Sequence, residues 1–339
     1  MKTFVRQFVR FVLIIFVPIS ILLILYLYFD PFKVVYNYED YSMDGKYNYV
    51  TANSDFVATQ IYLKNYKTQN YNSYIFGNSR TLAFNPKEWA KYISNSSKIF
   101  VFNANEETLF GILGKLKFIE KKGADINNAL VLLDARTLRE VENSTGHLFI
   151  KHPAISGESW IDFHASFFNA FLSHFFFIKY IDYTFLKKYR LYMTGAIDIR
   201  KIPIDKITNE PTFLFFEEDL KDSLMFYKKN ASIFYNRPEK EVEGDLVIDA
   251  KSFAMLEKIK KSFERNKTDY KIIINPLYDQ VKLNKKDIEK LKNIFGAKNI
   301  YDFSGKNSYT NNIGYYYETS HFRPTLGALL LYEIYKKGY

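Results

Sequence analysis

The 339-residue chain contains no cysteine, which excludes a disulfide framework, a thiol nucleophile and a thiolate metal site. Its five histidines are scattered over the sequence, at positions 147, 152, 164, 174 and 321. His147 and His152 lie five residues apart without an obvious third ligand, so we expect both at the surface. There is no internal repeat and no low-complexity segment, and the sequence predicts neither a metal site nor a cofactor.

One long apolar segment, Phe11 to Phe29, lies near the N-terminus and carries no charge. As a helix, its nineteen residues would span about 28 Å, close to the ~30 Å hydrocarbon core of a bilayer. Lys2, Arg6 and Arg10 precede the segment and Asp30 follows it. By the positive-inside tendency, the N-terminus is predicted to stay in the cytoplasm and the rest of the chain to lie outside the plasma (inner) membrane.

A cleaved signal peptide is the alternative interpretation of this segment. The residues that follow the apolar run, 26–33, are bulky and contain no small-x-small cleavage site. We therefore predict a cytoplasmic tail (1–10), an uncleaved transmembrane anchor (11–29), a tyrosine-rich linker (30–50) and an extracytoplasmic domain (51–339).

The overall composition is typical of a folded protein, with 47% apolar and 25% charged residues. The net charge of +10 suits an anionic neighbourhood such as phospholipid head groups or acidic glycans. The charges are spread along the chain, however, so an ordinary solvated surface also explains them. Nucleic acid is not expected as a partner of an exported domain.

Beyond residue 50, short apolar runs alternate with helical patterns, which predicts a doubly wound, flavodoxin-like α/β fold with a parallel sheet of about five strands and helices on both faces. The predicted strands are 74–76, 98–102, 129–133, 270–275 and 299–303. The predicted helices are 53–66, 86–95, 106–122, 250–266, 283–296 and 325–337.

Residues 140–250 interrupt this alternation and are predicted to form a mostly helical insertion. Within it, Phe163–Ile178 contains no Asp, Glu, Lys or Arg, and phenylalanine recurs every fourth residue from Phe163 to Phe175, as on one helical face. Sixteen residues are few for a membrane span. The segment is therefore expected to be a buried helix or, alternatively, an interfacial helix or a docking face for a membrane partner.

Two polar motifs lie at opposite ends of the α/β pattern, and the first is Gly77-Asn78-Ser79-Arg80, directly after an apolar run. A serine there would lie at the carboxyl edge of the sheet, where Gly77 permits a tight turn and the N–H groups of a helix start favour a developing anion. Alternatively, Ser79 is only an N-cap, which is the commoner role of serine in such a turn.

The second motif, Glu318-x-x-His321, comes just before the last predicted helix. A serine hydroxyl needs a base to remove its proton, and an imidazole needs a carboxylate to fix its tautomer. Alone, Glu318-x-x-His321 would be read as a solvated helix start. Together the two motifs predict that Ser79 Oγ lies within hydrogen-bond reach of one ring nitrogen of His321 and that Glu318 faces the other.

With these motifs the chain resembles the SGNH/GDSL hydrolase superfamily, and within it the membrane-anchored proteins of D-alanyl teichoic-acid transfer and of alginate and capsule O-acetylation. The resemblance covers roughly residues 70–139 and 250–337. "GNSR" matches the first block with Asn78 in place of Asp, and "ETSHFRP" matches the last block with Glu318 in place of Asp. The resemblance implies Ser79 as the nucleophile, His321 as the general base and Glu318 as its orienting acid.

The middle blocks of that family, which usually supply a glycine N–H and an asparagine side chain to the oxyanion hole, differ here. Residues 102–108 contain no glycine, and Asp134 follows the third predicted strand. We therefore expect the backbone N–H groups of Ser79 and of Ala104 or Asn105 to form the oxyanion hole, and an anionic Asp134 would repel the oxyanion.

Two arginines, Arg80 and Arg323, flank the predicted site. Each is expected either to bind a polar or anionic acceptor or to form a structural ion pair.

The resemblance implies a serine-dependent O-acyltransferase, transferring an acetyl or other acyl group to a cell-surface polysaccharide, with a multi-pass membrane-bound O-acyltransferase delivering the acyl group. A hydrolase of the same fold, with water as the acceptor, is the first alternative. The second is a non-catalytic scaffold or binding protein in cell-envelope glycan modification.

Overall fold

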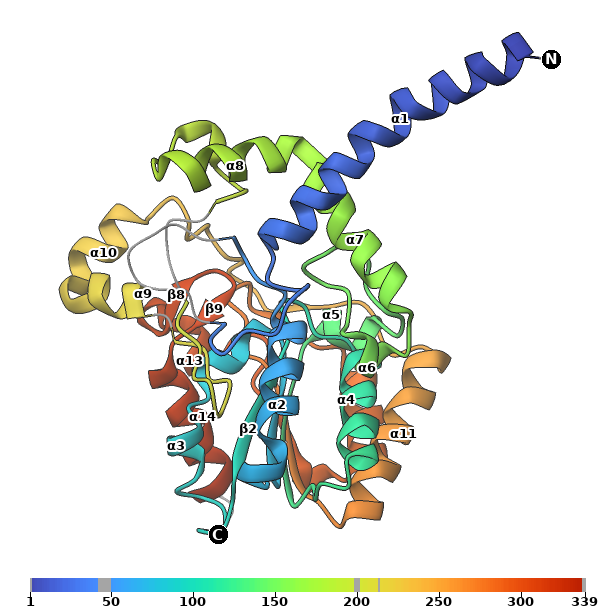
Figure 1. The fold of residues 1–339 in the computed structure, drawn as a ribbon. Coiled ribbons are helices and arrows are strands. Elements are labelled where there is room, and N and C mark those ends of the chain that lie inside the picture. Colours follow the sequence, from blue (N-terminus) through green and yellow to red (C-terminus); the bar gives the residue numbers. More distant parts are fainter. Residues whose placement is uncertain (1, 42–49, 198–201, 213, 337–339) are drawn as a thin grey trace.

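A computed structural model describes residues 2–41, 50–197, 202–212 and 214–336. At its centre lies a parallel sheet of five strands in the order β2-β1-β3-β5-β7, which confirms the predicted α/β fold (Figure 1). Each strand lies within a residue or two of an apolar run that predicted it. The strands are β1 (Ser73–Gly77), β2 (Ile99–Asn103), β3 (Asn128–Leu133), β5 (Asp269–Ile274) and β7 (Ile300–Asp302).

Helices cover both faces of the sheet, and each face has its own apolar core. Tyr74 and Phe76 of β1 point into one core, and Ile75 between them points into the other. Because both faces are buried, the strands are continuous apolar runs rather than alternating ones. The first core is covered by α2 (Ser54–Gln69), α4 (Leu109–Lys121), α11 (Ala250–Asn266) and α12 (Lys285–Phe295). The second is covered by α3 (Pro86–Trp89) and α14 (Pro324–Lys336).

Five of the six predicted helices of the α/β part are present, and polar side chains cap the start of several of them. Asn53, Thr108 and Asp249 each accept a backbone N–H of the helix that follows. The prediction of a helix over residues 86–95 is wrong, because α3 ends after one turn. Ser94, Asn95 and Ser96 lie just beyond, and such side chains favour turns over helix interiors.

The insertion is mostly helical, as expected, but Phe163–Ile178 is not one helix. His174 and Phe175 have positive φ angles of 51° and 55°, and the chain breaks there into two helices. Phe163, Phe167 and Phe171 are fully buried, whereas Phe175 is 68% exposed. The α-helices of the insertion are α6 (Pro153–Ser156), α7 (Trp160–Leu172), α8 (Phe176–Leu186), α9 (Leu214–Asp219) and α10 (Ser223–Lys229), and the short α5 (Ala135–Arg139) precedes it.

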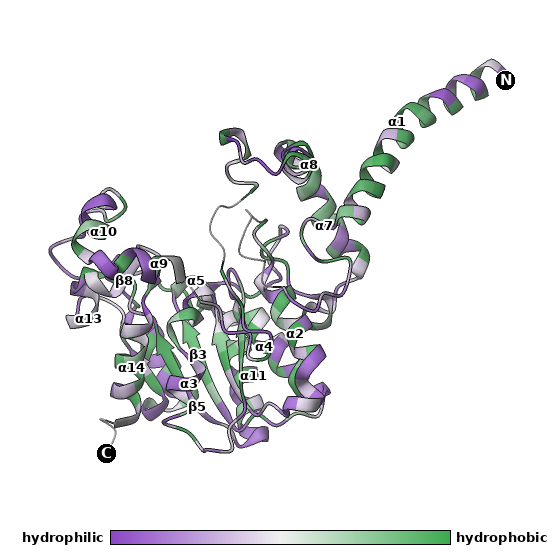
Figure 2. Cartoon of the chain, turned by 60° about the vertical axis from the view of Figure 1, so that its left-hand side comes forward, coloured by the Kyte–Doolittle hydropathy of each residue, from purple (hydrophilic) through white to green (hydrophobic). Residues whose placement is uncertain are grey.

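The N-terminal helix α1 (Lys2–Phe29) is long and apolar enough to cross a membrane. It is hydrophobic over most of its length and hydrophilic near its start (Figure 2). Its last turns pack on the domain, since Leu22 and Leu25 lie against the first core and the buried Tyr26 contacts the rings of Phe168 and Phe171 on α7.

The chain after α1 turns back on itself instead of leaving as an extended spacer. The Asp30 carboxylate accepts the backbone N–H groups of Val34 at 2.8 Å and Val35 at 2.9 Å. This turn places Phe32 and Val34 in the first core. Residues 30–41 of the expected linker are therefore part of the domain, and 42–49 lie outside the described residues.

The remaining short strands and the short helix α13 come from residues 242–322. β8 (Tyr316–Glu318) and β9 (His321–Phe322) form an antiparallel hairpin, which is the element that matters for the site. The others are β4 (Val242–Glu243), β6 (Val281–Lys282) and α13 (Ser308–Asn311).

Candidate active site

Ser79 lies at the carboxyl end of β1, as the first residue of the 3-10 helix η1 (Ser79–Ala83). Asn78 caps this turn by accepting the Arg80 N–H at 3.1 Å. The turn requires glycine at position 77 because a Cβ there would lie 2.9 Å from Leu132 Cβ of the neighbouring strand. The reason is thus close strand packing, since Gly77 does not have a positive φ.

His321 and Glu318 reach the same edge of the sheet from the β8–β9 hairpin. Phe322 anchors the hairpin, because it is buried in the second core and its ring lies 6.0 Å from that of Phe84. Helix α14 then packs unusually close to η1, since a Cβ on Gly327 would lie 1.8 Å from the carbonyl oxygen of Ala83. Gly327 therefore lets α14 approach the short helix that begins with Ser79.

The three predicted residues form a continuous chain of hydrogen bonds. His321 Nε2 lies 2.7 Å from Ser79 Oγ, and His321 Nδ1 is bonded to Glu318 Oε1. With its hydrogen on Nδ1, the imidazole donates to Glu318 and accepts the Ser79 hydroxyl proton. Ser320 N–H donates to the other Glu318 oxygen at 2.6 Å. The predicted contact geometry is therefore present in full.

The Glu318 carboxylate is held in its ionised form. Partial burial would raise its pKa, but the hydrogen bonds from His321 and from the Ser320 backbone outweigh that effect and leave the pKa of Glu318 below its usual value. An ionised Glu318 stabilises positive charge on the His321 ring, which is what a general base needs after it has taken a proton.

Asp134, expected to repel an oxyanion, is instead engaged by three neighbours. Its Oδ2 accepts from Asn78 Nδ2 at 2.9 Å and from Arg80 Nη1 at 2.8 Å, and its Oδ1 caps α5 by accepting the Thr137 N–H. Arg80 also donates from Nε to the Ser320 carbonyl. Arg80 therefore compensates the charge of Asp134 and ties the end of β1 to the His321 loop.

Three backbone N–H groups were expected as oxyanion donors, and the structure places Ser79 and Asn105 at the site and gives the N–H of Ala104 another partner. The Ala104 N–H donates to the Gly77 carbonyl at 3.1 Å, and so continues the β1–β2 pairing. Asn105 and Ser79 both line the cavity described below. The Asn105 side chain bonds to the Ala52 carbonyl and so fixes the loop that carries its backbone N–H.

A fully buried group of four charges supports that same loop. Lys115 contacts Asp55 at 2.9 Å and is bonded to Glu107, and Lys151 contacts Glu107 at 3.2 Å. Gly111 makes room for the group, because a Cβ there would overlap the Glu107 carboxylate. The two positive charges balance the two negative ones, which is the condition under which buried ions are tolerated.

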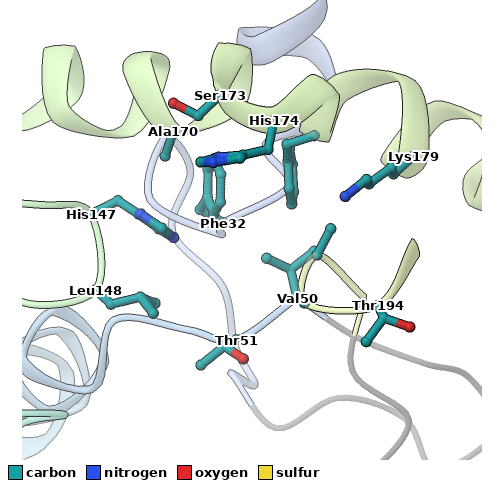
Figure 3. Close-up of a pocket in the computed structure, with 13 residues that line it drawn as sticks. Phe32, Val50, Thr51, His147, Leu148, Ala170, Ser173, His174, Lys179 and Thr194 are labelled. Carbon is teal, nitrogen blue, oxygen red and sulfur yellow. The ribbon is translucent and has the colours of Figure 1, made fainter. Parts of the chain in front are cut away.

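The cavity over Ser79 has a volume of about 610 Å³ and is lined by residues that follow β1, β2, β3 and β5. Their charges are mixed, with Glu106 paired to Arg136 at the rim. A second cavity, of about 540 Å³, lies under α8 and holds His147, His174 and Lys179 (Figure 3). Ser173 lines this second cavity, but its hydroxyl donates to the Asn169 carbonyl at 2.8 Å, so the arrangement expected of a serine nucleophile is found in the first cavity.

The structure selects one of the two roles expected for Arg323 and corrects the position expected for His152. Arg323 is not among the residues that line the first cavity; it pairs with Glu217 at 3.0 Å and donates to the Gly314 carbonyl. It therefore stabilises the hairpin region. The expectation that His152 lies at the surface is wrong: its ring is buried against Phe56 and Trp160, and its Nδ1 caps α6 by accepting the Ala154 N–H at 3.0 Å.

Comparison of the chain with protein-family models and with curated proteins finds no match. Sequence reasoning missed the roles of Asn78 and Asp134, although a signal was present. Both follow strands that pair in the sheet, β1 and β3, and an aspartate directly before a short helix is a common N-cap.

Proposed function

We propose that this chain is a membrane-anchored serine O-acyltransferase or esterase of the SGNH type that modifies a cell-surface polysaccharide. The observation that carries the proposal is the bonded chain from Ser79 Oγ through His321 to Glu318. The strand order also supports it, because β2-β1-β3-β5-β7 corresponds to the flavodoxin-like order 2-1-3-4-5 when the sheet strands are counted alone. In that order, the site at the carboxyl edge lies where the order reverses.

In the first step of the proposed reaction, Ser79 Oγ attacks the acyl carbonyl while its proton moves to His321 Nε2. The N–H groups of Ser79 and Asn105 would bind the oxyanion. The tetrahedral intermediate then collapses, the leaving group takes the proton from Nε2, and an acyl ester remains on Ser79. In the second step, a hydroxyl of the glycan gives its proton to Nε2 and attacks the ester, and Ser79 recovers the proton.

We propose that α1 spans the plasma membrane with the N-terminus in the cytoplasm, which places the domain outside the cell. The basic residues Lys2, Arg6 and Arg10 at one end of the helix support this orientation. A multi-pass O-acyltransferase would then be the source of the acyl group, as the resemblance implies.

Labelling with a fluorophosphonate tests the site directly. The full-length protein should react at Ser79, and both Ser79→Ala and His321→Ala should lose the label at unchanged protein level. Ser232→Ala, at an exposed turn outside the residues that line the cavity, is the matched control and should label normally. Normal labelling of Ser79→Ala, or none in the wild-type protein, would favour the scaffold function.

The rate at which the acyl-enzyme loses its acyl group shows whether the acceptor is a polysaccharide or water. After a pulse of an activated acetyl ester, acetyl-Ser79 should persist in water and be discharged faster when polysaccharide is added. Rapid discharge in water, at a rate that polysaccharide does not change, would identify the protein as a hydrolase.

A further inference from the structure

A patch of apolar side chains is exposed on α8 and on the 3-10 helix η3 (Leu191–Met193). Its most exposed members are Phe175 at 68%, Phe185 at 70% and Leu191 at 88%. We call the patch the α8 face; it consists of Phe175, Ile178, Phe185, Leu186, Leu191 and Tyr192. Grouped apolar side chains of this size on a surface mark a site of interaction.

The α8 face results from the way in which α8 is packed. Phe176 and Tyr183, seven residues apart, point inward and are buried, whereas Ile178 and Phe185 point outward on the opposite side of the helix. The cavity of Figure 3 lies between α8 and the loop at Val50, and the inner side of α8 packs through Phe176 on Phe32 and on Phe171 of α7. The domain itself therefore does not use the outer side of α8.

The α8 face adjoins the end of the apolar anchor. The Phe29 ring, the last of α1, lies 6.1 Å from that of Tyr180 and 6.2 Å from that of Phe185. Contact between α1 and the domain begins at Leu22, so the last eight residues of the apolar segment, about 12 Å of helix, lie level with α7 and α8. A bilayer that covers Phe11–Phe29 therefore reaches α8.

The polar groups around the α8 face suit the surface of such a bilayer. Lys179, Lys187 and Lys188 lie on or next to α8, and Lys187 and Lys188 are exposed. The single acidic residue of α8, Asp182, is paired with Arg190, which compensates its charge, and also accepts a hydrogen bond from the Tyr192 hydroxyl. Apolar and aromatic side chains beside lysines are the combination that binds at the interface of anionic membranes.

We propose that residues 175–192 form an in-plane membrane anchor that inserts the α8 face among the lipid head groups of the leaflet from which α1 emerges. This inference rests on the membrane span in the proposed function and is independent of the chemistry of Ser79. Lipid is favoured over a protein partner because the α8 face continues directly from the end of the lipid-facing helix.

The anchor has a consequence for access to the active site. α5 follows the carboxyl end of β3 and β8 carries Glu318, and in both views these two elements lie at the end of the domain from which α1 leaves (Figures 1 and 2). Two attachments, α1 and the α8 face, would fix the tilt of the domain and keep the carboxyl edge of the sheet turned toward the membrane. The acyl donor would then reach Ser79 from the membrane side, as a molecule bound in or delivered at the bilayer.

The absence of native cysteine permits a direct test. Single-cysteine variants of the full-length chain, Phe185→Cys and Leu191→Cys, would carry an environment-sensitive fluorophore in nanodiscs of phosphatidylcholine with phosphatidylglycerol. Leu246→Cys, also at an exposed apolar position, is the matched control, and Phe16→Cys reports the span itself. We expect a blue shift and quenching by lipid-attached nitroxides at 185 and 191 as well as at 16, but not at 246.

Three other patterns of quenching would each overturn the in-plane anchor. Quenching at 16 without quenching at 185 and 191 overturns the in-plane anchor and leaves the span intact. No quenching at 16 overturns the span and, with it, this inference, whereas fluorophosphonate labelling of Ser79 would be unaffected. Shielding of 185 and 191 in native membranes but not in pure lipid nanodiscs would mean that a protein partner covers the α8 face, which also overturns the proposal.

Discussion

At the scale of single residues, each member of the candidate triad is held by a contact that its own short segment provides. Ser79 begins a turn capped by Asn78, and Glu318 is fixed by the backbone of Ser320, two residues away. Local motifs of this kind are visible in a sequence, which is why Ser79, Glu318 and His321 could be predicted. Two of the three partners of Asp134, Asn78 and Arg80, follow the neighbouring strand β1, so this part of its role depends on the pairing of β1 with β3.

Replacement of Glu318 should reveal its role as an orienting group. Glu318→Gln keeps the shape of the side chain but removes the charge that stabilises the protonated imidazole, so we expect fluorophosphonate labelling to slow by about 10²–10⁴-fold without disappearing. Glu217→Gln, which removes a carboxylate paired with Arg323 outside the cavity, should label at the wild-type rate. Equal rates for Glu318→Gln and the wild-type protein would exclude a catalytic carboxylate at this position.

His152 makes the stability of the domain depend on pH. Burial lowers the pKa of His152 to about 4, although Asp55 acts in the opposite direction. The unfolded chain binds a proton near pH 6.5 while the folded one does not, so stability is lost as pH falls from about 6.5 to 4, by up to about 3 kcal/mol. His152→Asn retains an N-cap and should remove this part of the pH dependence of the unfolding free energy.

His174→Asn is the matched control for that measurement. His174 is exposed and has a positive φ, which asparagine tolerates. The unfolding free energy of the His174→Asn protein should show the same pH dependence as that of the wild-type protein. If His152→Asn and the wild-type protein lose the same stability between pH 7 and pH 4.5, His152 is not the group that titrates.

At the scale of elements, strands were predicted better than helix ends. Runs such as Ala129–Leu133 fill both cores and have no other place in a folded chain. The break at His174 could not be predicted, because the phenylalanine period continues through Phe175 and only the packing of α7 and α8 around Phe32 ends it. Likewise, no local signal distinguished the packed residues 30–41 from a linker.

Helix α14 and the short helix η1 are in close contact at Gly327 and Ala83. Gly327→Ala places a methyl group 1.8 Å from the Ala83 carbonyl oxygen, so the two helices must move apart. We expect a loss of about 1–3 kcal/mol in unfolding free energy, against a gain of about 1 kcal/mol in helix propensity, and slower labelling of Ser79. Thr325→Ala, at an exposed position of the same helix, should change neither quantity measurably. A more stable, normally labelled Gly327→Ala protein would mean that the helices are not in close contact.

At the scale of the whole molecule, the proposed membrane span and the folded domain overlap in sequence. Leu22 to Phe29 belong to the apolar segment by composition and to the domain by packing. The boundary drawn from the sequence at residue 30 therefore separates Tyr26 from Phe171, which it contacts. The cause is that a hydrophobicity pattern cannot distinguish contact with lipid from contact with protein.

The overlap predicts how the chain responds to truncation. A chain that begins at residue 30 loses Tyr26, which is 1% exposed, together with the contacts of Leu22 and Leu25. Complete burial of one such side chain contributes about 1.5–3 kcal/mol, so in mild detergent this chain should unfold at a lower temperature than one that begins at residue 22. Tyr26→Ala in the longer chain should reproduce most of the difference, and Leu23→Ala, at an exposed position of the same turn, should reproduce none of it. Equal unfolding temperatures for the two truncated chains would mean that the last two turns of α1 contribute nothing to the domain, and the level of the bilayer inferred for α8 would lose its support.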